Sequence, residues 1–226
     1  MPLRETPMST PWSRRTFLFT AASASIAPSF SLAAQEALPS SPDEALQRLM
    51  EGNRRFAADQ YTSIAQDLKV LKEHTVDKQE PFAAVLSCAD SRVPVELVFD
   101  QTIGHIFVSR VAGNIINSEI IGSLEYGAAV LGAKVLLVMG HANCGAVKAA
   151  IAKKPVPGQI ASLYPHLQPA IEAAGGDLVA TIKKNAQIQA SLLAQTSTVL
   201  RPLVNEGKLK IQAAFYDVAT GAVTLL

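Results

Sequence analysis

The sequence predicts an α/β fold, in which a single domain has a mainly parallel β-sheet core flanked by helices. Two observations lead to this prediction. Short apolar runs of strand length alternate with longer segments of helical periodicity, and such alternation favours parallel pairing. The strongest run, residues 134–140, is apolar on both faces, as a buried parallel strand requires. With 226 residues, 49% of them hydrophobic, the chain can fill one hydrophobic core.

The first half of the predicted fold starts with an amphipathic helix. Ser41 is a typical N-cap, Pro42 suits the first helical position, and Glu44 completes the pattern of a capping box. Apolar residues then recur at helical spacing, and we expect this helix and a weaker second one to pack on a partner subunit. The elements expected in this half are helices at 42–58 and 64–74 and strands at 82–87 and 106–109.

The second half continues the alternation of helices and strands. Gly132 ends a helix that has one apolar face, and Pro155 and Pro157 break the helix after the next strand. A turn at Gly221 separates the last two strands. We expect helices at 118–131, 146–152, 160–173 and 177–200, and strands at 134–140, 209–217 and 222–225.

The charge balance gives no electrostatic reason to expect binding to nucleic acid. The formal net charge is +1, whereas nucleic-acid binding depends on an excess of Lys and Arg on one surface. The sequence also predicts no stable membrane anchor, because no segment reaches the ~20 unbroken apolar residues that a helix needs to span a bilayer.

The N-terminal segment resembles an export signal. Residues 13–18, Ser-Arg-Arg-Thr-Phe-Leu, are similar to the twin-arginine motif, and a moderately apolar stretch follows them. Ser31 and Ala33 provide the small residues that cleavage after position 33 needs. We therefore expect a cleavable signal at 1–33 that is recognised by the twin-arginine export machinery, a mature domain at 34–226 and a periplasmic location. A flexible N-terminal tail is the alternative.

Both cysteines of the chain lie where predicted parallel strands end. Cys88 follows the strand at 82–87, and His141 and Cys144 follow the strand at 134–140. Sites in parallel sheets form at the carboxyl ends of the strands, so we expect these three side chains to converge. Thiolate and imidazole are the ligands that zinc prefers, and three protein ligands leave open the fourth position that a catalytic site needs.

A structural disulfide between Cys88 and Cys144 is the alternative in an oxidising compartment. The neighbouring residues favour the metal site, because a disulfide needs neither His141 nor the charged pair of Asp90 and Arg92. Thiol titration with and without a chelator separates the two hypotheses, since a disulfide gives no free thiols under either condition.

Four short motifs occur in order along the chain, namely CADSR at 88–92, SRVAGN at 109–114, SLEYG at 123–127 and GHANCGA at 140–146. With them the chain resembles the β-class carbonic anhydrases over residues 42–220. The resemblance implies an enzyme that hydrates carbon dioxide reversibly to bicarbonate and a proton through attack of zinc-bound hydroxide. It also implies one Zn²⁺ per subunit, and a homodimer or homotetramer with active sites at the subunit interface.

The resemblance also assigns roles to individual residues. Cys88, His141 and Cys144 would be the metal ligands, and Asp90 and Arg92 would form the catalytic dyad. The substrate-binding positions that it implies are Gln79, Phe107, Ala112, Glu125, Tyr126 and Gly145. Gln79 matches a glutamine that reaches into the neighbouring subunit's site, and Phe107, Ala112 and Tyr126 match positions that line a small apolar pocket for carbon dioxide.

The two thiolate ligands explain why a dyad is needed. They cancel the charge of the zinc ion, so the ion alone acidifies its water less than it would with three histidines. Asp90 is placed to accept the hydroxide proton, and Arg92 to keep Asp90 ionised and oriented. A surface ion pair without function is the alternative for these two residues. Some family members bind the metal through this aspartate, but they need a tryptophan where this chain has Val85, so we expect the open form.

Two other functions stay open at this point. One is a non-catalytic zinc- or bicarbonate-binding protein on the same fold, which would need none of Asp90, Arg92 and Gln79. The other is a hydrolase of carbon disulfide or carbonyl sulfide, which would use the same zinc site on a linear substrate. A panel of substrates separates these functions. His105 is either a proton shuttle or a residue of a surface loop.

Overall fold

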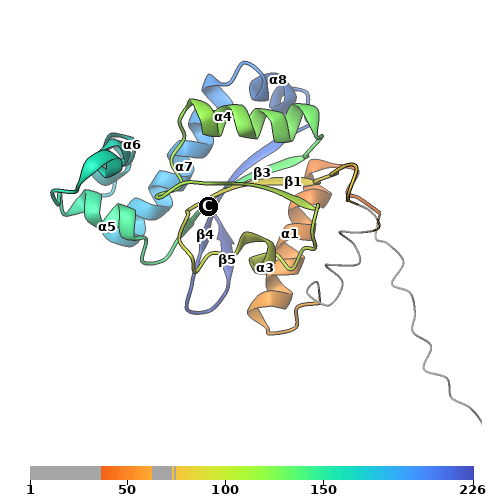
Figure 1. Cartoon of the computed structure of the whole chain (residues 1–226), viewed down its shortest axis with the longest axis horizontal. Helices are drawn as coiled ribbons and strands as arrows, with labels where there is room; N and C mark the ends of the chain where they lie inside the picture. The colour runs from red at the N-terminus through yellow and green to blue at the C-terminus, as the bar shows by residue number, and fades with distance from the viewer. Residues whose placement is uncertain (1–36, 63–72, 74) are drawn as a thin grey trace, which may run out of the picture. The chain divides into compact units, whose positions relative to one another are not determined.

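Five strands form the central sheet of the structure, in the order β2-β1-β3-β4-β5 (Figure 1). The first four strands in this order are parallel, and β5 is antiparallel to β4. The structure is a computed structural model that describes residues 37–62, 73 and 75–226. The strands are β1 Ala83–Ser87, β2 Ile106–Arg110, β3 Val135–His141, β4 Lys210–Tyr216 and β5 Val223–Leu225.

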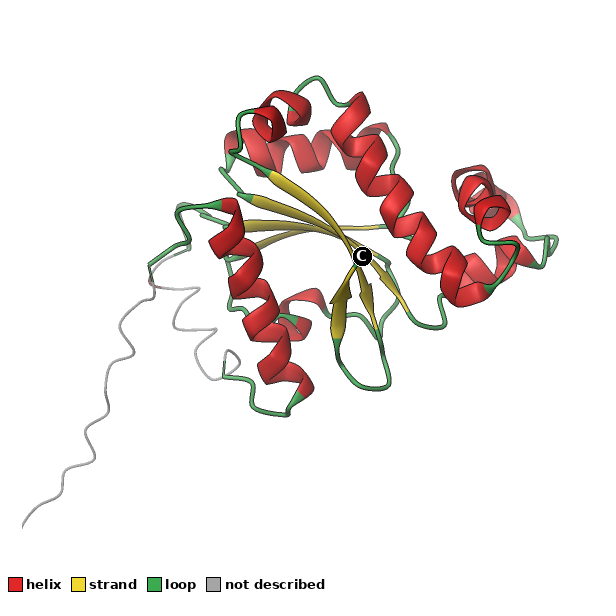
Figure 2. Cartoon of the chain, turned by 180° about the vertical axis from the view of Figure 1, so that it is seen from behind, coloured by secondary structure: helices red, strands yellow, loops and turns green. Residues whose placement is uncertain are grey.

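Helices cover both faces of the sheet and complete a three-layer arrangement (Figures 1 and 2). The helices are α1 Pro42–Ala57, α3 Val95–Val98, α4 Ser118–Glu125, α5 Gly145–Ile151, α6 Tyr164–Ala173, α7 Leu178–Thr196 and α8 Leu200–Asn205, with a π-helical turn η2 Tyr126–Val130 and a 3₁₀ turn η3 Gly158–Leu163. Residues of α1 and α3 pack on one face, and residues of α4, α7 and α8 pack on the other. The predicted α/β fold with a mainly parallel sheet is confirmed.

The start of α1 follows from the residues that the sequence indicates. Ser41 has an extended backbone, and its hydroxyl accepts the N–H of Glu44. The carboxylate of Glu44 accepts the hydroxyl and the N–H of Ser40, at 2.7 and 2.8 Å, and these bonds lower its pKa. The second bond of the capping box therefore goes to the residue before the N-cap, and not to the N-cap itself as predicted.

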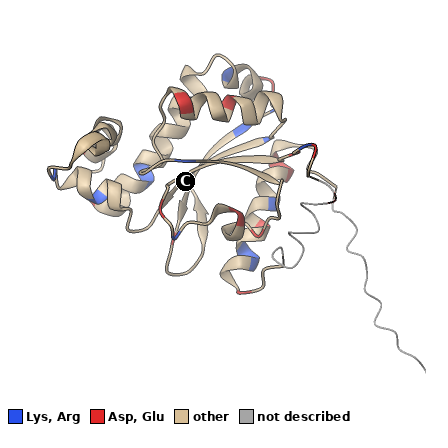
Figure 3. Cartoon of the chain, viewed as in Figure 1, with Lys and Arg blue, Asp and Glu red and all other residues tan. Residues whose placement is uncertain are grey.

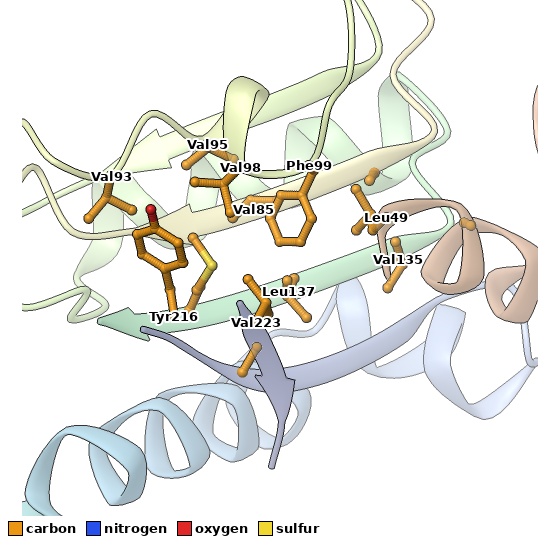
Figure 4. Packing of buried hydrophobic residues seen from close by; sticks show 14 of the residues in the cluster. Leu49, Val85, Val93, Val95, Val98, Phe99, Val135, Leu137, Tyr216 and Val223 are labelled. Atoms are coloured by element: carbon orange, nitrogen blue, oxygen red, sulfur yellow. The ribbon is translucent and has the colours of Figure 1, made fainter. Parts of the chain in front are cut away.

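Alternate residues of the strands point to opposite faces of the sheet and build two parts of the core. On the face covered by α1 and α3, Val85 and Leu137 pack with Phe99 (Figure 4). On the opposite face, Leu86 and Val138 pack with residues of α4 and α7. Because both faces of the sheet are covered, the parallel strands have the continuous apolar sequences that predicted them.

The helix predicted at 177–200 is two helices in the structure. α7 ends at Thr196, and Ser197 has an extended ψ of 122°. The Ser197 hydroxyl accepts the N–H of Leu200 at 2.9 Å and donates to the carboxylate of Glu125 at 2.6 Å. A serine side chain that binds nearby N–H groups competes with helix continuation, and here it starts α8.

The helix predicted at 118–131 changes its winding before it ends. The N–H of Leu131 donates to the carbonyl of Tyr126, five residues earlier, so the last turn is π-helical. Gly127 lies in this turn, where a Cβ would come within 2.9 Å of the Phe107 ring. The wider turn thus brings the helix backbone against the aromatic side chain of β2.

Two predicted segments cannot be compared with the structure. The signal at 1–33 lies outside the described residues, and so does the helix at 64–74 except for residue 73. The short helix α3 was not predicted, because four residues are too few to show helical periodicity.

The described part of the chain has charged residues of both signs interspersed along its elements (Figure 3). None of the helices in this part is both long and apolar enough to cross a membrane.

Candidate metal centre

Two neighbouring strands bring the first two candidate ligands together. β1 and β3 pair in parallel with Ser87 opposite Met139, so the carboxyl ends of the two strands lie side by side. Cys88 directly follows β1, and His141 is the last residue of β3. Both side chains are buried. The prediction that ligands distant in sequence converge at the carboxyl ends of the strands is confirmed.

The third ligand comes from the turn that leads from β3 into α5. Asn143 has a φ of 58°, a left-handed conformation that asparagine tolerates better than most residues. This conformation reverses the chain within three residues and places Cys144 at the N-cap of α5. Because the turn is so short, the side chains of His141 and Cys144 lie close to each other.

The three side chains have the spacing of a metal site. The ligand atoms of Cys88, His141 and Cys144 all lie within 4.8 Å of one another. The two sulfur atoms are 3.9 Å apart. Two Zn–S bonds of ~2.3 Å at a tetrahedral angle would place them about 3.8 Å apart.

The histidine has the correct nitrogen free for a metal. Its Nδ1 lies 3.0 Å from the carbonyl oxygen of Ala142, and since a carbonyl only accepts, Nδ1 carries the proton. Its Nε2 is buried and, among the described residues, has no hydrogen-bond partner. The nearest carboxylate oxygen, Oδ2 of Asp90, is 3.7 Å away, which is too long for a hydrogen bond. A lone pair buried in this way fits a metal ligand.

The pKa values of the two thiols are shifted in opposite directions. The hydrogen bond from Cys144 lowers the pKa of Cys88 to about 4 against the opposing effect of burial, with help from His141 and from the N–H of Gly113. Its thiolate partner and burial raise the pKa of Cys144. The pair therefore holds one proton, on Cys144, and a metal ion that binds both sulfurs must displace it.

Asp90 and Arg92 form the predicted dyad. The guanidinium donates from Nε to Oδ1 at 2.9 Å and from Nη2 to Oδ2 at 2.8 Å, and the N–H of Arg92 adds a third bond to Oδ1 at 2.9 Å. These bonds hold the pKa of Asp90 well below its usual range. Both oxygens of Asp90 are bound by Arg92, and the open form of the site remains a prediction.

Arg110 is a residue of the site that sequence reasoning missed. Its Nε donates to the carbonyl of Cys88 at 3.0 Å, and its Nη2 donates to the carbonyl of Asp90 at 2.6 Å. One side chain at the end of β2 thus fixes the backbone of both a metal ligand and a dyad residue. The arginine is part of a quoted motif, but nothing in the motif shows that its partners are main-chain carbonyls.

The other predicted site residues fall into two groups. Ala112 lies in the turn before Gly113, whose N–H donates to the Cys88 sulfur at 3.3 Å, and Gly145 directly follows Cys144. A Cβ at Gly145 would meet nothing within 4 Å, so packing inside the chain does not require a glycine there. These two positions lie beside the ligands of their own chain.

The remaining positions are placed elsewhere. Phe107 pairs with Ala84 in the register of β1 and β2, and Ala84 lies four residues before Cys88. The ring centroid of Phe107 is 6.1 Å from that of Tyr126. Gln79 is exposed and precedes β1, at the opposite end of the strand from the metal ligands. Glu125 binds Ser197, as described above. Their roles in substrate binding remain predictions that depend on a partner subunit.

His105 is also remote from the ligands of its own chain. It precedes β2, its carbonyl accepts the N–H of Phe82, and its ring lies 6.1 Å from that of Phe82. This is the amino end of the strands, whereas the ligands lie at the carboxyl end. The histidine is therefore not placed to relay a proton within its own subunit.

A protein-family model described as "Carbonic anhydrase" matches residues 83–223, a range that contains the three ligands and the dyad. A carbonic anhydrase from Pseudomonas aeruginosa is 32% identical over 196 residues, which cover 79% of this chain and 86% of that protein.

Two further comparisons agree with these matches. Carbonic anhydrase 2 from Mycobacterium tuberculosis is 42% identical over 111 residues, which cover 49% of this chain and 53% of that protein. The chain thus spans about half the length of this curated relative. Crystal structures of two tetrameric β-carbonic anhydrases from Sordaria macrospora give a TM-score of 0.64 at 19% identity, with 80% of this chain and 96% of theirs covered. At this identity the likeness shows the fold alone.

Proposed function

The chain belongs to the carbonic anhydrase family, with the fold of the β class, and from this premise we propose that it hydrates carbon dioxide reversibly to bicarbonate and a proton. Cys88, His141 and Cys144 form a metal site that fits one Zn²⁺ per subunit. The observation that carries the proposal is the Nε2 of His141, which is buried, has no hydrogen-bond partner among the described residues, and lies 3.7 Å from Oδ2 of Asp90.

The zinc ion, when bound, supplies Lewis acidity and lowers the pKa of a coordinated water, to about 7 in the carbonic anhydrases that hold zinc with three histidines. The residues of this chain do the rest. Asp90 stays ionised because Arg92 binds both of its oxygens, so it can accept a hydrogen bond from a water beside the metal and orient its lone pairs. Arg110 holds the backbone that carries Asp90.

A second subunit would complete the substrate pocket. Gln79, Phe107 and Tyr126 lie away from the ligands of their own chain, and β2 is an edge strand of the described sheet. Tyr126 is 46% exposed and Val130 in the same turn is 67% exposed, so an apolar surface is available beside this edge. The Sordaria macrospora proteins of the same fold are tetrameric. We therefore propose a homodimer or homotetramer whose sites lie at subunit interfaces.

Export to the periplasm is a separate proposal, supported by the twin-arginine pattern at 13–18. The twin-arginine route carries folded proteins, which suits an enzyme that must bind its metal before export. Mass spectrometry of the periplasmic protein tests this: the proposal expects a chain that starts near residue 34, and an intact N-terminus contradicts it.

Stopped-flow hydration of carbon dioxide, with zinc quantified in the same sample, tests the proposed activity. We expect fast hydration that is lost together with the metal in Cys144→Ser, while Asp59→Asn, an exchange on the exposed loop after α1, keeps both. Full zinc occupancy without hydration would contradict the proposal. A parallel panel with carbonyl sulfide and carbon disulfide shows whether a sulfur substrate is preferred.

A further inference from the structure

Two buried carboxamides on α7 have no evident role in the core. Asn185 is 0% exposed and Gln189 is 2% exposed. They are four residues apart, so they lie one above the other on the same face of the helix. Burying an amide is costly unless its polar atoms are bonded, so the bonds that these two side chains make identify what they hold in place.

Both amides bind the segment between β2 and α4. Nδ2 of Asn185 donates to the carbonyl of Gly113 at 2.8 Å. Oε1 of Gln189 accepts the N–H of Ile116 at 3.0 Å. The segment 113–116 is therefore held at both ends by one helix.

The two amides also bind each other, which fixes their orientation. Nε2 of Gln189 donates to Oδ1 of Asn185 at 3.1 Å and to the carbonyl of His166 in α6 at 3.3 Å. Each amide uses both its oxygen and its nitrogen. A buried network that is satisfied in this way is rigid, because moving one member leaves another without its partner.

The first residue of this segment also hydrogen-bonds to a metal ligand. The N–H of Gly113 donates to the sulfur of Cys88 at 3.3 Å, while its carbonyl accepts from Asn185. Gly113 has a φ of 79°, a conformation that residues with a side chain rarely adopt. The two polar groups of one residue thus connect the α7 amides directly to the ligand.

We propose that Asn185 and Gln189 are positioning residues of the metal site, which aim the N–H of Gly113 at the Cys88 sulfur and so limit the charge that this thiolate donates to the metal. The inference rests on the proposed zinc function. Two thiolates reduce the Lewis acidity of a zinc ion, and a hydrogen bond to one of them withdraws electron density from sulfur and restores part of that acidity.

The first test uses the wild-type protein, labelled with ¹⁵N and reconstituted with ¹¹³Cd. A hydrogen bond from Gly113 to a metal-bound sulfur gives a scalar coupling between the amide proton and the cadmium nucleus. We expect this coupling at Gly113. If cadmium binds and no coupling appears there, the inference is wrong although the metal site stands. If cadmium does not bind, both the inference and the proposed function are wrong.

The second test compares Gln189→Met with Gln187→Met, the same exchange on the exposed face of the same helix. In the cobalt-substituted proteins we expect the thiolate-to-metal absorption of Gln189→Met at longer wavelength, because sulfur that loses its hydrogen bond gives up an electron more easily. Zinc affinity should fall about 10- to 100-fold, as for other residues that orient ligands. Gln187→Met should match the wild type in both measurements.

A merely structural role of Gln189 predicts a different result. The melting temperature of Gln189→Met would fall while the position of the absorption band stayed that of the wild type, and this outcome would overturn the inference. Should Gln189→Met not fold, absence of the cadmium coupling at Gly113 in the wild-type protein would still overturn the inference.

Discussion

The sulfur atoms of Cys88 and Cys144 lie 3.9 Å apart at the ends of two different segments, and the two thiols share one proton. The pKa of Cys88 is lowered to about 4 by its bond to Cys144, whereas the pKa of Cys144 is raised by the Cys88 thiolate and by burial. A metal that binds both sulfurs therefore finds one ligand already ionised and must displace the proton of the other.

We expect zinc binding at pH 6 to release about one proton from this pair. This pH lies above the pKa of Cys88 and below the value of about 7 for a zinc-bound water, so neither of these groups adds a second proton. Zinc affinity should consequently fall as the pH is lowered from 7 to 6, because a proton competes with the metal for Cys144. Titration calorimetry in two buffers with different ionisation enthalpies measures the released protons. Release of no proton would show that Cys144 is already ionised.

Asp90→Asn should lower kcat/KM about 10- to 100-fold while zinc stays bound, because the asparagine keeps the shape of the side chain but loses the charged acceptor. Arg92 holds the pKa of Asp90 below its usual range, so the carboxylate is fully ionised from pH 5 upward and its own titration adds no pH dependence to the loss between pH 6 and pH 9. Stopped-flow hydration with metal analysis checks both points. Unchanged activity with full zinc content would show that the ion pair has no part in catalysis.

Arg110→Gln should weaken zinc binding by roughly tenfold, since it removes the bonds that hold the carbonyls of Cys88 and Asp90. Competition with a chromophoric chelator measures the affinity. Arg54→Gln is the control, because the side chain of Arg54 is 67% exposed and its ion pair with Glu51 lies on the surface of α1. Equal zinc affinity in the two variants would contradict the role assigned to Arg110.

Two glycines in helices should respond to alanine in opposite directions. A Cβ at Gly52 in α1 would overlap the carbonyl oxygen of Phe99, whereas a Cβ at Gly122 in α4 would meet nothing within 4 Å. Gly52→Ala should therefore reduce the free energy of unfolding by about 1–3 kcal/mol through overpacking. Gly122→Ala should increase it by about 0.5–1 kcal/mol through helix propensity. Denaturant titration measures both, and stabilisation by Gly52→Ala would show that α1 does not pack on Phe99 as described.

The sequence was sufficient for the parts of the fold that depend on local pattern. Buried parallel strands such as β3 have continuous apolar sequences, and the Ser41 cap has a recognisable spacing, so both were predicted. The break at Ser197 was not, because serine also occurs inside helices, and the bond that orients its hydroxyl here goes to Glu125, which is 72 residues away. Local pattern contains no information on such a contact.

In the candidate site, too, the residues in local motifs were predicted and those that depend on the fold were not. The ligands and the dyad carry reactive side chains in short motifs, and these were predicted. Arg110, Asn185 and Gln189 were missed because they act through main-chain carbonyls and N–H groups, whose positions only the fold determines. An asparagine and a glutamine four residues apart on a helix are inconspicuous in a sequence and become informative once their partners are known.

The pairing of Ser87 with Met139 has a consequence for the choice of metal. Main-chain hydrogen bonds between β1 and β3 bring the cysteine and the histidine together when the sheet closes, without help from an ion. The centre is therefore a preorganised chelator, unlike sites that fold around their metal. Metal ions compete for a site whose ligand spacing is set by the strand pairing, so discrimination among them depends on ionic radius and on affinity for sulfur.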